Sequence, residues 1–96
     1  MPKCGLQVRL EAKPGSERDV EKLLTAAEEL VRREPGTKSW FATKTGPYTF
    51  GIFDTFDDEA GRQAHLTGKA AAALMANTSL FAKLPTIERV NLIGEK

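Results

Sequence analysis

The segment that decides the fold is "FGIFDTFDDEAGRQAHL", residues 50–66. Aromatic and apolar side chains recur with period two along residues 48–56, which is typical of a β-strand. Asp57 follows at the position of a helix N-cap, and the acidic residues after it favour a helix start over residues 58–66. The segment therefore predicts a strand that leads directly into a helix, and this helix carries His65, the only histidine of the chain.

The predicted strand has aromatic residues on both faces. One face carries Tyr48, Phe50, Ile52, Asp54 and Phe56, and the other carries Thr49, Gly51, Phe53 and Thr55. Helices packed on the sheet cover one face, and the alternation leaves open which one. A bare aromatic face would exceed the apolar patch that most monomers expose. We therefore expect a second copy of the same sheet to cover it, in a homodimer with twofold symmetry.

Three further strands flank this segment in the sequence. Residues 37–44 form a short run rich in aromatic and β-branched residues, and a turn at residues 45–47 joins it to residues 48–56. These two runs predict an antiparallel hairpin. Alternating apolar residues predict one strand at residues 5–12 and a last one at residues 86–93.

An amphipathic helix is expected between the first two strands. Apolar residues recur at helical spacing from Val20 to Val31, which forms one stripe for packing. Ser16 stands at the N-cap position with Asp19 three residues later, a weaker version of the capping box. The helix is expected to stop at residues 34–36, Glu-Pro-Gly, because a helix rarely continues through Pro followed by Gly.

The second helical region is divided into pieces. Gly68 interrupts it, residues 69–77 resume it, and residues 80–84 are expected to add one more turn. The resulting order, β-α-β-β-α-β, predicts an α+β, ferredoxin-like fold with an antiparallel four-stranded sheet and both helices on one face. A chain of 96 residues is expected to form a single domain over residues 1–96.

Composition argues against several classes of function. The formal net charge is +1 with no basic patch, which argues against a nucleic-acid partner. No run of about 18 apolar residues predicts a membrane span, and the N-terminus has no signal-peptide pattern. Cys4 is the only cysteine, which suits a cytoplasmic location. One His and one Cys do not supply the ligands of a structural zinc site, so we expect no metal.

Three stretches of the chain resemble the antibiotic biosynthesis monooxygenase family of small dimeric α+β-barrel proteins. They are "KPGSERDVEKLL", "EPGTKSWF" and "FDTFDDEAGRQAHL". Members of the family typically show an acidic residue near the end of a strand, then an aromatic residue, an acidic helix start and a histidine nine residues after the aromatic. The corresponding residues here are Asp54, Phe56, residues 57–59 and His65. The resemblance covers nearly the whole chain and implies a family domain over residues 1–96.

The resemblance implies a cavity inside each protomer, between the sheet and the second helix, closed in part by the dimer mate. Characterised relatives oxidise electron-rich phenols or quinols with O₂, without flavin, haem or metal. A dry pocket that favours the substrate anion and admits oxygen suffices for this chemistry. The expected function is thus a cofactor-independent monooxygenase acting on an aromatic, phenolic or quinol-type small molecule.

His65 and Asp54 are the expected catalytic residues. An imidazole with a pKa near 6.5 accepts a phenolic proton at neutral pH, and the alternative is a partly buried histidine hydrogen-bonded to backbone. Asp54 lies among aromatic residues, so its carboxylate must be paired or perturbed. It is expected either to orient His65 or a substrate hydroxyl, or to form a structural salt bridge with Arg9 or Arg89.

Apolar residues are expected to form the wall of the substrate pocket. They are Trp40, Tyr48, Phe50, Ile52, Met75 and Phe81. Trp40 and Phe41 point to opposite faces of their strand, and we expect Trp40 to face the pocket. Two alternatives remain open: a non-catalytic dimeric module that binds a small hydrophobic ligand, and an isomerase on the same scaffold.

Overall fold

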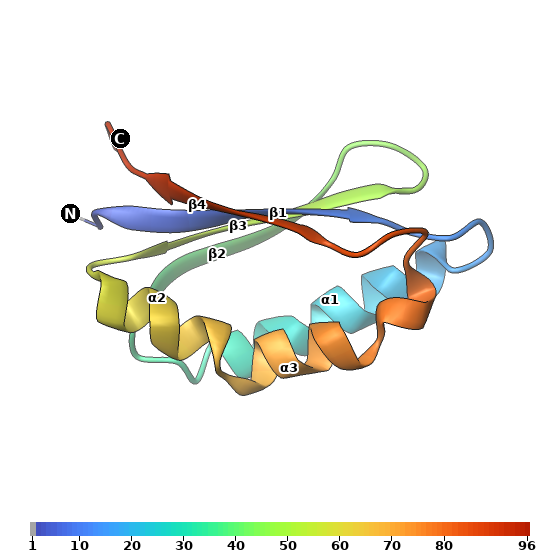
Figure 1. Ribbon diagram of the computed structural model, residues 1–96, viewed down its shortest axis with the longest axis horizontal. Helices are drawn as coiled ribbons and strands as arrows, with labels where there is room; N and C mark the ends of the chain where they lie inside the picture. Colours follow the sequence, from blue (N-terminus) through green and yellow to red (C-terminus); the bar gives the residue numbers. More distant parts are fainter. Residues whose placement is uncertain (1) are drawn as a thin grey trace.

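Four antiparallel strands form one sheet, and all the helices lie on one of its faces (Figure 1). This computed structural model describes residues 2–96. The elements in chain order are β1 (Cys4–Glu11), α1 (Glu17–Val31), β2 (Thr37–Lys44), β3 (Thr49–Phe56), α2 (Glu59–Leu66), α3 (Lys69–Ala76), the short 3₁₀ turn η1 (Thr78–Leu80) and β4 (Thr86–Asn91). The strand order across the sheet is β2-β3-β1-β4. The predicted ferredoxin-like α+β fold is confirmed.

The register of the sheet decides which strand face meets the helices. In the central pair, Val8 of β1 lies opposite Ile52 of β3, and Leu10 lies opposite Phe50. These side chains point to the helices and bury the core together with one stripe of α1. The buried residues of this core are Leu10, Ala12, Val20, Leu24, Phe50, Ile52, Leu74 and Phe81, and a second cluster holds Cys4, Leu6 and Phe56.

The other face of the sheet is open. Phe41 of β2 lies opposite Phe53 of β3, so two aromatic side chains are neighbours on this face. Phe41 is 59% exposed, one of the most exposed large apolar residues in the described chain. The face left uncovered by the helices is thus the one that carries Phe53, and the face that carries Phe50 is the core face.

Helix α1 differs from its sequence prediction at both ends. Ser16 occupies the N-cap position, but its side chain makes no capping hydrogen bond, so the predicted capping box is wrong. The helix ends at Val31, before the predicted stop, and the Glu34 amide donates to the Val31 carbonyl in a turn. Glu34 therefore lies off the helix, in the loop that leads to β2.

The C-terminal half also corrects three boundaries. The N-cap of α2 is Asp58 and not Asp57, and the Asp58 side chain accepts a hydrogen bond from the Gly61 amide at 2.9 Å. The helical turn predicted at residues 80–84 is absent: η1 ends at Leu80, and Phe81 is extended and bridges to Ala12. Strand β4 ends at Asn91, two residues before its predicted end.

None of the helices within residues 2–96 has the length and apolar character needed to cross a bilayer.

Candidate functional site

A buried histidine held between two carboxylates is the most unusual feature of the helix-side core. His65 on α2 is only 8% exposed. Its Nε2 atom lies 3.1 Å from Asp54 Oδ2 on β3, and its Nδ1 atom lies 2.6 Å from Glu34 Oε1 in the loop after α1. Three separate segments of the chain therefore meet at one imidazole ring.

Each segment delivers its side chain for a local reason. Alternation along β3 turns Asp54 to the same side as Phe50 and Ile52, toward the helices. The early end of α1 frees Glu34 to turn inward. Gly36 and Gly61 allow the loop and α2 to approach closely, since a Cβ on Gly36 would lie 3.0 Å from the Gly61 Cα atom.

Asp54 retains unused hydrogen-bonding capacity although it is fully buried, with an exposed fraction of 0%. Neither of its carboxylate oxygens has an aligned hydrogen bond from residues 2–96, so the 3.1 Å contact with His65 is an ion pair of imperfect geometry. A buried acceptor without a donor is costly and rare in proteins. Asp54 is therefore able to accept a hydrogen bond, or a proton, from a bound molecule.

Glu34 was missed as a functional candidate in the sequence, where it was interpreted only as part of a helix stop. Its side chain is 19% exposed, and its Oε1 atom accepts a hydrogen bond from Thr37 Oγ1 at 2.7 Å as well as the contact from His65. The one available signal was an acidic residue directly before Pro-Gly, and that signal does not point to His65.

The electrostatics of the site favour a charged imidazole. Burial disfavours the imidazolium and lowers the pKa of His65, but the contacts with the Asp54 and Glu34 carboxylates outweigh burial. The net effect raises the pKa of His65 above its usual value of 6.5. Carboxylates only accept hydrogen bonds, so both ring nitrogens carry protons when both carboxylates are ionised. The Phe56 ring packs beside the imidazole at 5.5 Å between ring centroids.

A small apolar cavity adjoins this polar cluster. Its volume is about 40 Å³, well below the roughly 300–1,000 Å³ of typical small-molecule sites. The lining residues are Leu6, Val8, Ala27, Trp40, Ile52, Asp54, His65, Leu66, Ala70, Ala71, Leu74 and Ile87. Asp54 and His65 are the only ionisable residues among them, so they supply the charged groups that a bound molecule would meet.

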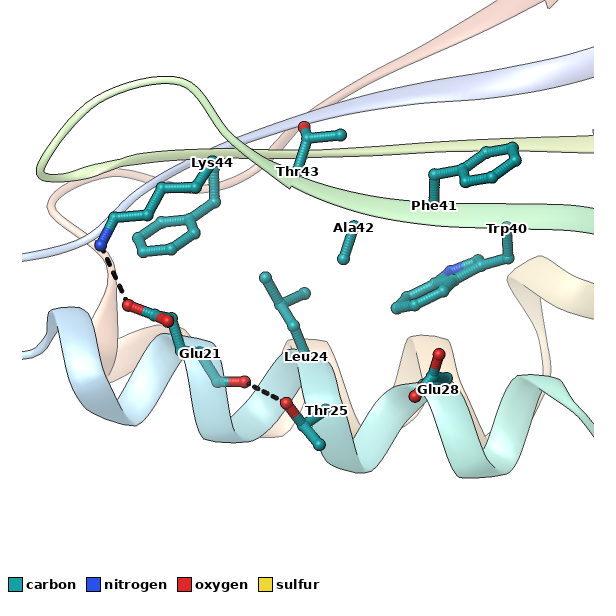
Figure 2. Close-up of a pocket in the computed structure, with 10 residues that line it drawn as sticks. Glu21, Leu24, Thr25, Glu28, Trp40, Phe41, Ala42, Thr43 and Lys44 are labelled. Atoms are coloured by element: carbon teal, nitrogen blue, oxygen red, sulfur yellow. Dashed lines mark hydrogen bonds and ion pairs between the residues drawn. The ribbon is translucent and has the colours of Figure 1, made fainter.

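A larger groove of about 370 Å³ lies between α1 and the edge strand β2 (Figure 2). Leu24 and Trp40 point into it from the two elements, while Phe41 points to the opposite side of β2. An ion pair between Lys44 and Glu21, with 3.0 Å between nitrogen and oxygen, stands at one end. Trp40 lines both the groove and the inner cavity.

The structure brings together some of the predicted site residues and not others. Trp40, Ile52, Asp54 and His65 share the inner cavity. Phe50 is a buried core residue that lines the outer groove. Three predicted residues lie away from the cavity: Tyr48 and Met75 are exposed, and Phe81 is buried in the core.

The predicted salt bridge from Asp54 to an arginine is wrong. Arg9 pairs with Glu11 at 3.1 Å, and Arg89 lies 3.7 Å from Glu59. The expected backbone partner of His65 is also replaced by the two carboxylates. The two carboxylates contact different nitrogens of the ring, and within residues 2–96 no three His, Cys, Asp or Glu side chains form a group that could hold a metal ion.

Comparison with solved structures places the chain among known proteins. It is 56% identical to a protein of unknown function from Nitrosomonas europaea, with a TM-score of 0.96, and the match covers 100% of this chain and 94% of that one. The chain belongs to the same family as this Nitrosomonas protein. No protein-family model and no curated protein matches the chain.

More distant structures share the fold. A provisionally named antibiotic biosynthesis monooxygenase from Caulobacter crescentus is 18% identical with a TM-score of 0.85, covering 97% of this chain and 92% of that one. Another structure named antibiotic biosynthesis monooxygenase is 15% identical with a TM-score of 0.83, covering 95% and 99%. The resemblance to this family stated from the sequence is confirmed at the level of the fold.

Proposed function

We propose that this protein is a cofactor-independent monooxygenase that oxidises an aromatic, phenolic or quinol-type small molecule with O₂. The observation that carries the proposal is the Asp54 carboxylate, which is fully buried beside an apolar cavity and has no aligned hydrogen-bond donor among the described residues. A substrate hydroxyl supplies the missing donor. The names of structures with the same fold, antibiotic biosynthesis monooxygenases, support the same reaction class.

Proton removal is the step that the protein promotes in this proposal. Asp54 accepts the proton of the substrate hydroxyl, and the resulting phenolate is a stronger one-electron reductant than the neutral phenol. The phenolate transfers one electron to O₂, and the resulting substrate radical and superoxide combine to form a carbon–oxygen bond. The peroxide then breaks its O–O bond and loses the remaining C–H proton, which releases water and leaves the carbonyl. For an anthrone-type methylene the balance is CH₂ + O₂ → C=O + H₂O. All four electrons come from the substrate carbon, so no external reductant is required.

The geometry favours Asp54 as the proton acceptor, whereas the sequence hypothesis gave that role to His65. Both nitrogens of His65 face carboxylates, so the group with free acceptor capacity is Asp54. His65 stands behind Asp54, and its positive charge offsets the charge of the buried carboxylate. We therefore assign the proton-accepting role to Asp54 and a supporting role to His65.

The substrate is proposed to enter from the outer groove. A volume of about 370 Å³ is within the range of small-molecule sites, roughly 300–1,000 Å³. The inner cavity of about 40 Å³ accepts a substrate ring only after a side chain moves. Trp40 lines both spaces, so we expect rotation of its indole to join them and to bring a ring bound in the groove to Asp54.

We also propose that the protein is a cytoplasmic homodimer whose open sheet faces pack together. The register pair formed by Phe41 and Phe53 would lie within the interface. Phe41 is more than half exposed in the protomer, and burying its ring stabilises association. The same face carries Arg9 and Glu88, which suit the polar surroundings of such a contact.

Oxygen uptake with a panel of hydroquinones, naphthoquinols and anthrones tests the proposed reaction. The panel compares wild type, Asp54→Asn, His65→Ala and a reaction without protein. We expect uptake above the spontaneous rate, and a fall of about tenfold or more in Asp54→Asn, equivalent to roughly 1.4 kcal/mol of transition-state stabilisation. Asp57→Asn is the matched control, because Asp57 is exposed and, among residues 2–96, forms an ion pair only with Lys38.

The outcomes separate the alternatives. Equal uptake in wild type and Asp54→Asn would remove Asp54 from the chemistry. Absence of uptake with every compound would contradict the monooxygenase proposal, and turnover without oxygen would indicate an isomerase.

A second candidate function is a non-catalytic module that binds a small hydrophobic ligand. The small size of the inner cavity and the engagement of both His65 nitrogens favour this candidate. Trp40 is the only tryptophan, so its fluorescence reports directly on this site. A saturable change in Trp40 emission on adding a naphthoquinol, without oxygen uptake, would support the binding module.

A further inference from the structure

We propose that Glu34 is a positioning residue: it orients the His65 ring so that Nε2 faces Asp54, and it is the group through which the Nδ1 proton exchanges with solvent. This inference rests on the proposed function where it concerns turnover. The orientation and proton exchange of His65 are measurable whether or not the protein consumes oxygen.

The contact geometry supports the orienting role. The Glu34–His65 contact, at 2.6 Å, is shorter than the Asp54–His65 contact, at 3.1 Å, so Glu34 holds the ring more tightly than Asp54 does. Thr37 Oγ1 donates to the same Glu34 oxygen at 2.7 Å and fixes that carboxylate in turn. Glu34 thus fixes the orientation of the imidazole through Nδ1, and this orientation directs Nε2 toward Asp54.

The surroundings of Glu34 support the exchange role. Asp54 is fully buried, whereas the Glu34 side chain is partly exposed and borders two surface recesses. One recess, of about 240 Å³, also contains Arg33 and Lys69. The other, of about 250 Å³, contains Thr37 and Lys38. A proton on Nδ1 therefore passes to Glu34 Oε1 and from there to water, and no comparable route starts at Asp54.

Within residues 2–96, the side chains that the neighbouring elements place around the imidazole offer no other ionisable path from His65 to the surface than Glu34. β3 contributes the Asp54 carboxylate and the Phe56 ring, and α3 contributes apolar Ala70 and Leu74 to the shared cavity. On α2 itself, Arg62 donates to the carbonyl oxygens of Gly5 and Val90 and pairs with Glu59. Glu34 is thus the ionisable group in contact with His65 that also reaches the surface.

Nitrogen-15 NMR of His65, the only histidine, tests the inference directly. The titration compares wild type, Glu34→Gln, Glu34→Asp and the control Glu29→Gln, an exposed glutamate of α1. Glutamine keeps an oxygen acceptor of the same shape and removes the charge. We expect the pKa of His65 to fall by about one unit in Glu34→Gln, to recover in part in Glu34→Asp, and to stay unchanged in Glu29→Gln.

The same variants are assayed for oxygen uptake against pH. Loss of the Glu34 charge should move the upper pH limit of uptake downward together with the pKa of His65, while uptake at low pH remains. An unchanged pKa of His65 in Glu34→Gln, or an Nδ1 atom without a proton at low pH, would overturn the inference. If no variant consumes oxygen, the proposed function fails, and the NMR titration still decides the role of Glu34. Glu34→Asp gives the answer if Glu34→Gln does not fold.

Discussion

Gly36 and Gly61 cross so closely that a Cβ atom on Gly61 would lie 2.9 Å from the Gly36 carbonyl oxygen. This crossing joins the loop after α1 to the first turn of α2. It lies two residues from Glu34 and four residues from His65, the pair that makes the 2.6 Å contact. The close approach of the Gly36 and Gly61 backbones therefore sets the distance between the segments that carry Glu34 and His65.

Gly61→Ala should destabilise the protein although alanine favours helices. The gain in helix propensity is about 1 kcal/mol, and the clash with backbone costs about 1–3 kcal/mol because neither segment shifts freely. Denaturant unfolding should show a net loss of about 1 kcal/mol, since the clash outweighs the propensity. Gly46→Ala is the control, because a Cβ there meets nothing within 4 Å. A Gly61→Ala protein as stable as wild type would contradict the close crossing.

Protonation of His65 should make stability depend on pH. The pKa of His65 is raised in the folded protein, so its stabilisation is fully present below the unfolded pKa of about 6.5. The stabilisation is lost as the pH rises through the folded pKa. Urea unfolding at a series of pH values should show that the free energy of unfolding of wild type falls, relative to that of His65→Gln, as the pH rises from about 6.5 through the folded pKa. Parallel curves for the two proteins would argue against a raised pKa.

Phe56→Ala should be among the most destabilising single changes. Phe56 is fully buried in the smaller core cluster, and its ring packs beside His65. Removal of a buried phenylalanine ring typically costs about 3–5 kcal/mol. Met75→Ala, at an exposed position on α3, should change the free energy of unfolding by less than about 1 kcal/mol. Similar losses for the two variants in a denaturant titration would contradict the assigned core.

Phe41→Asp should weaken the proposed dimer. The substitution introduces a carboxylate on the open sheet face, opposite Phe53, where a second copy would bury it without a partner. Analytical ultracentrifugation should show a dimer for wild type and a monomer for Phe41→Asp at the same concentration. Met75→Asp, an exposed change on the helix side, should leave the dimer intact. Monomeric wild type at every concentration would rule out this interface.

Local patterns in the sequence were enough to predict the elements and their order. Residues 37–44 were predicted as a strand and are β2, and the break at Gly68 separates α2 from α3 as expected. The errors in the predicted secondary structure lie mainly at the ends of helices and strands, where a single hydrogen bond can decide at which residue the element begins or ends. Asp58, rather than Asp57, caps α2 because its side chain is the one that reaches the Gly61 amide.

The candidate site was only partly predictable. His65 and Asp54 were proposed from the sequence, and the structure brings them within 3.1 Å. Glu34 was not proposed, because nothing in its own neighbourhood shows that α1 ends at Val31 or that α2 packs against the following loop. The sequence patterns place Tyr48, Met75 and Phe81 in the pocket, but these residues lie outside the inner cavity.

Local sequence patterns were sufficient to predict the helices and strands and their α+β order, though not every boundary, because hydrophobic periodicity and turn residues act over a few positions of the chain. Tertiary structure decided which face of β3 is buried and which carboxylates meet His65. Those contacts join residues 11 and 31 positions apart from His65, and their distances depend on strand register and on the crossing of Gly36 with Gly61. Such distances follow from packing between segments, which no local pattern specifies.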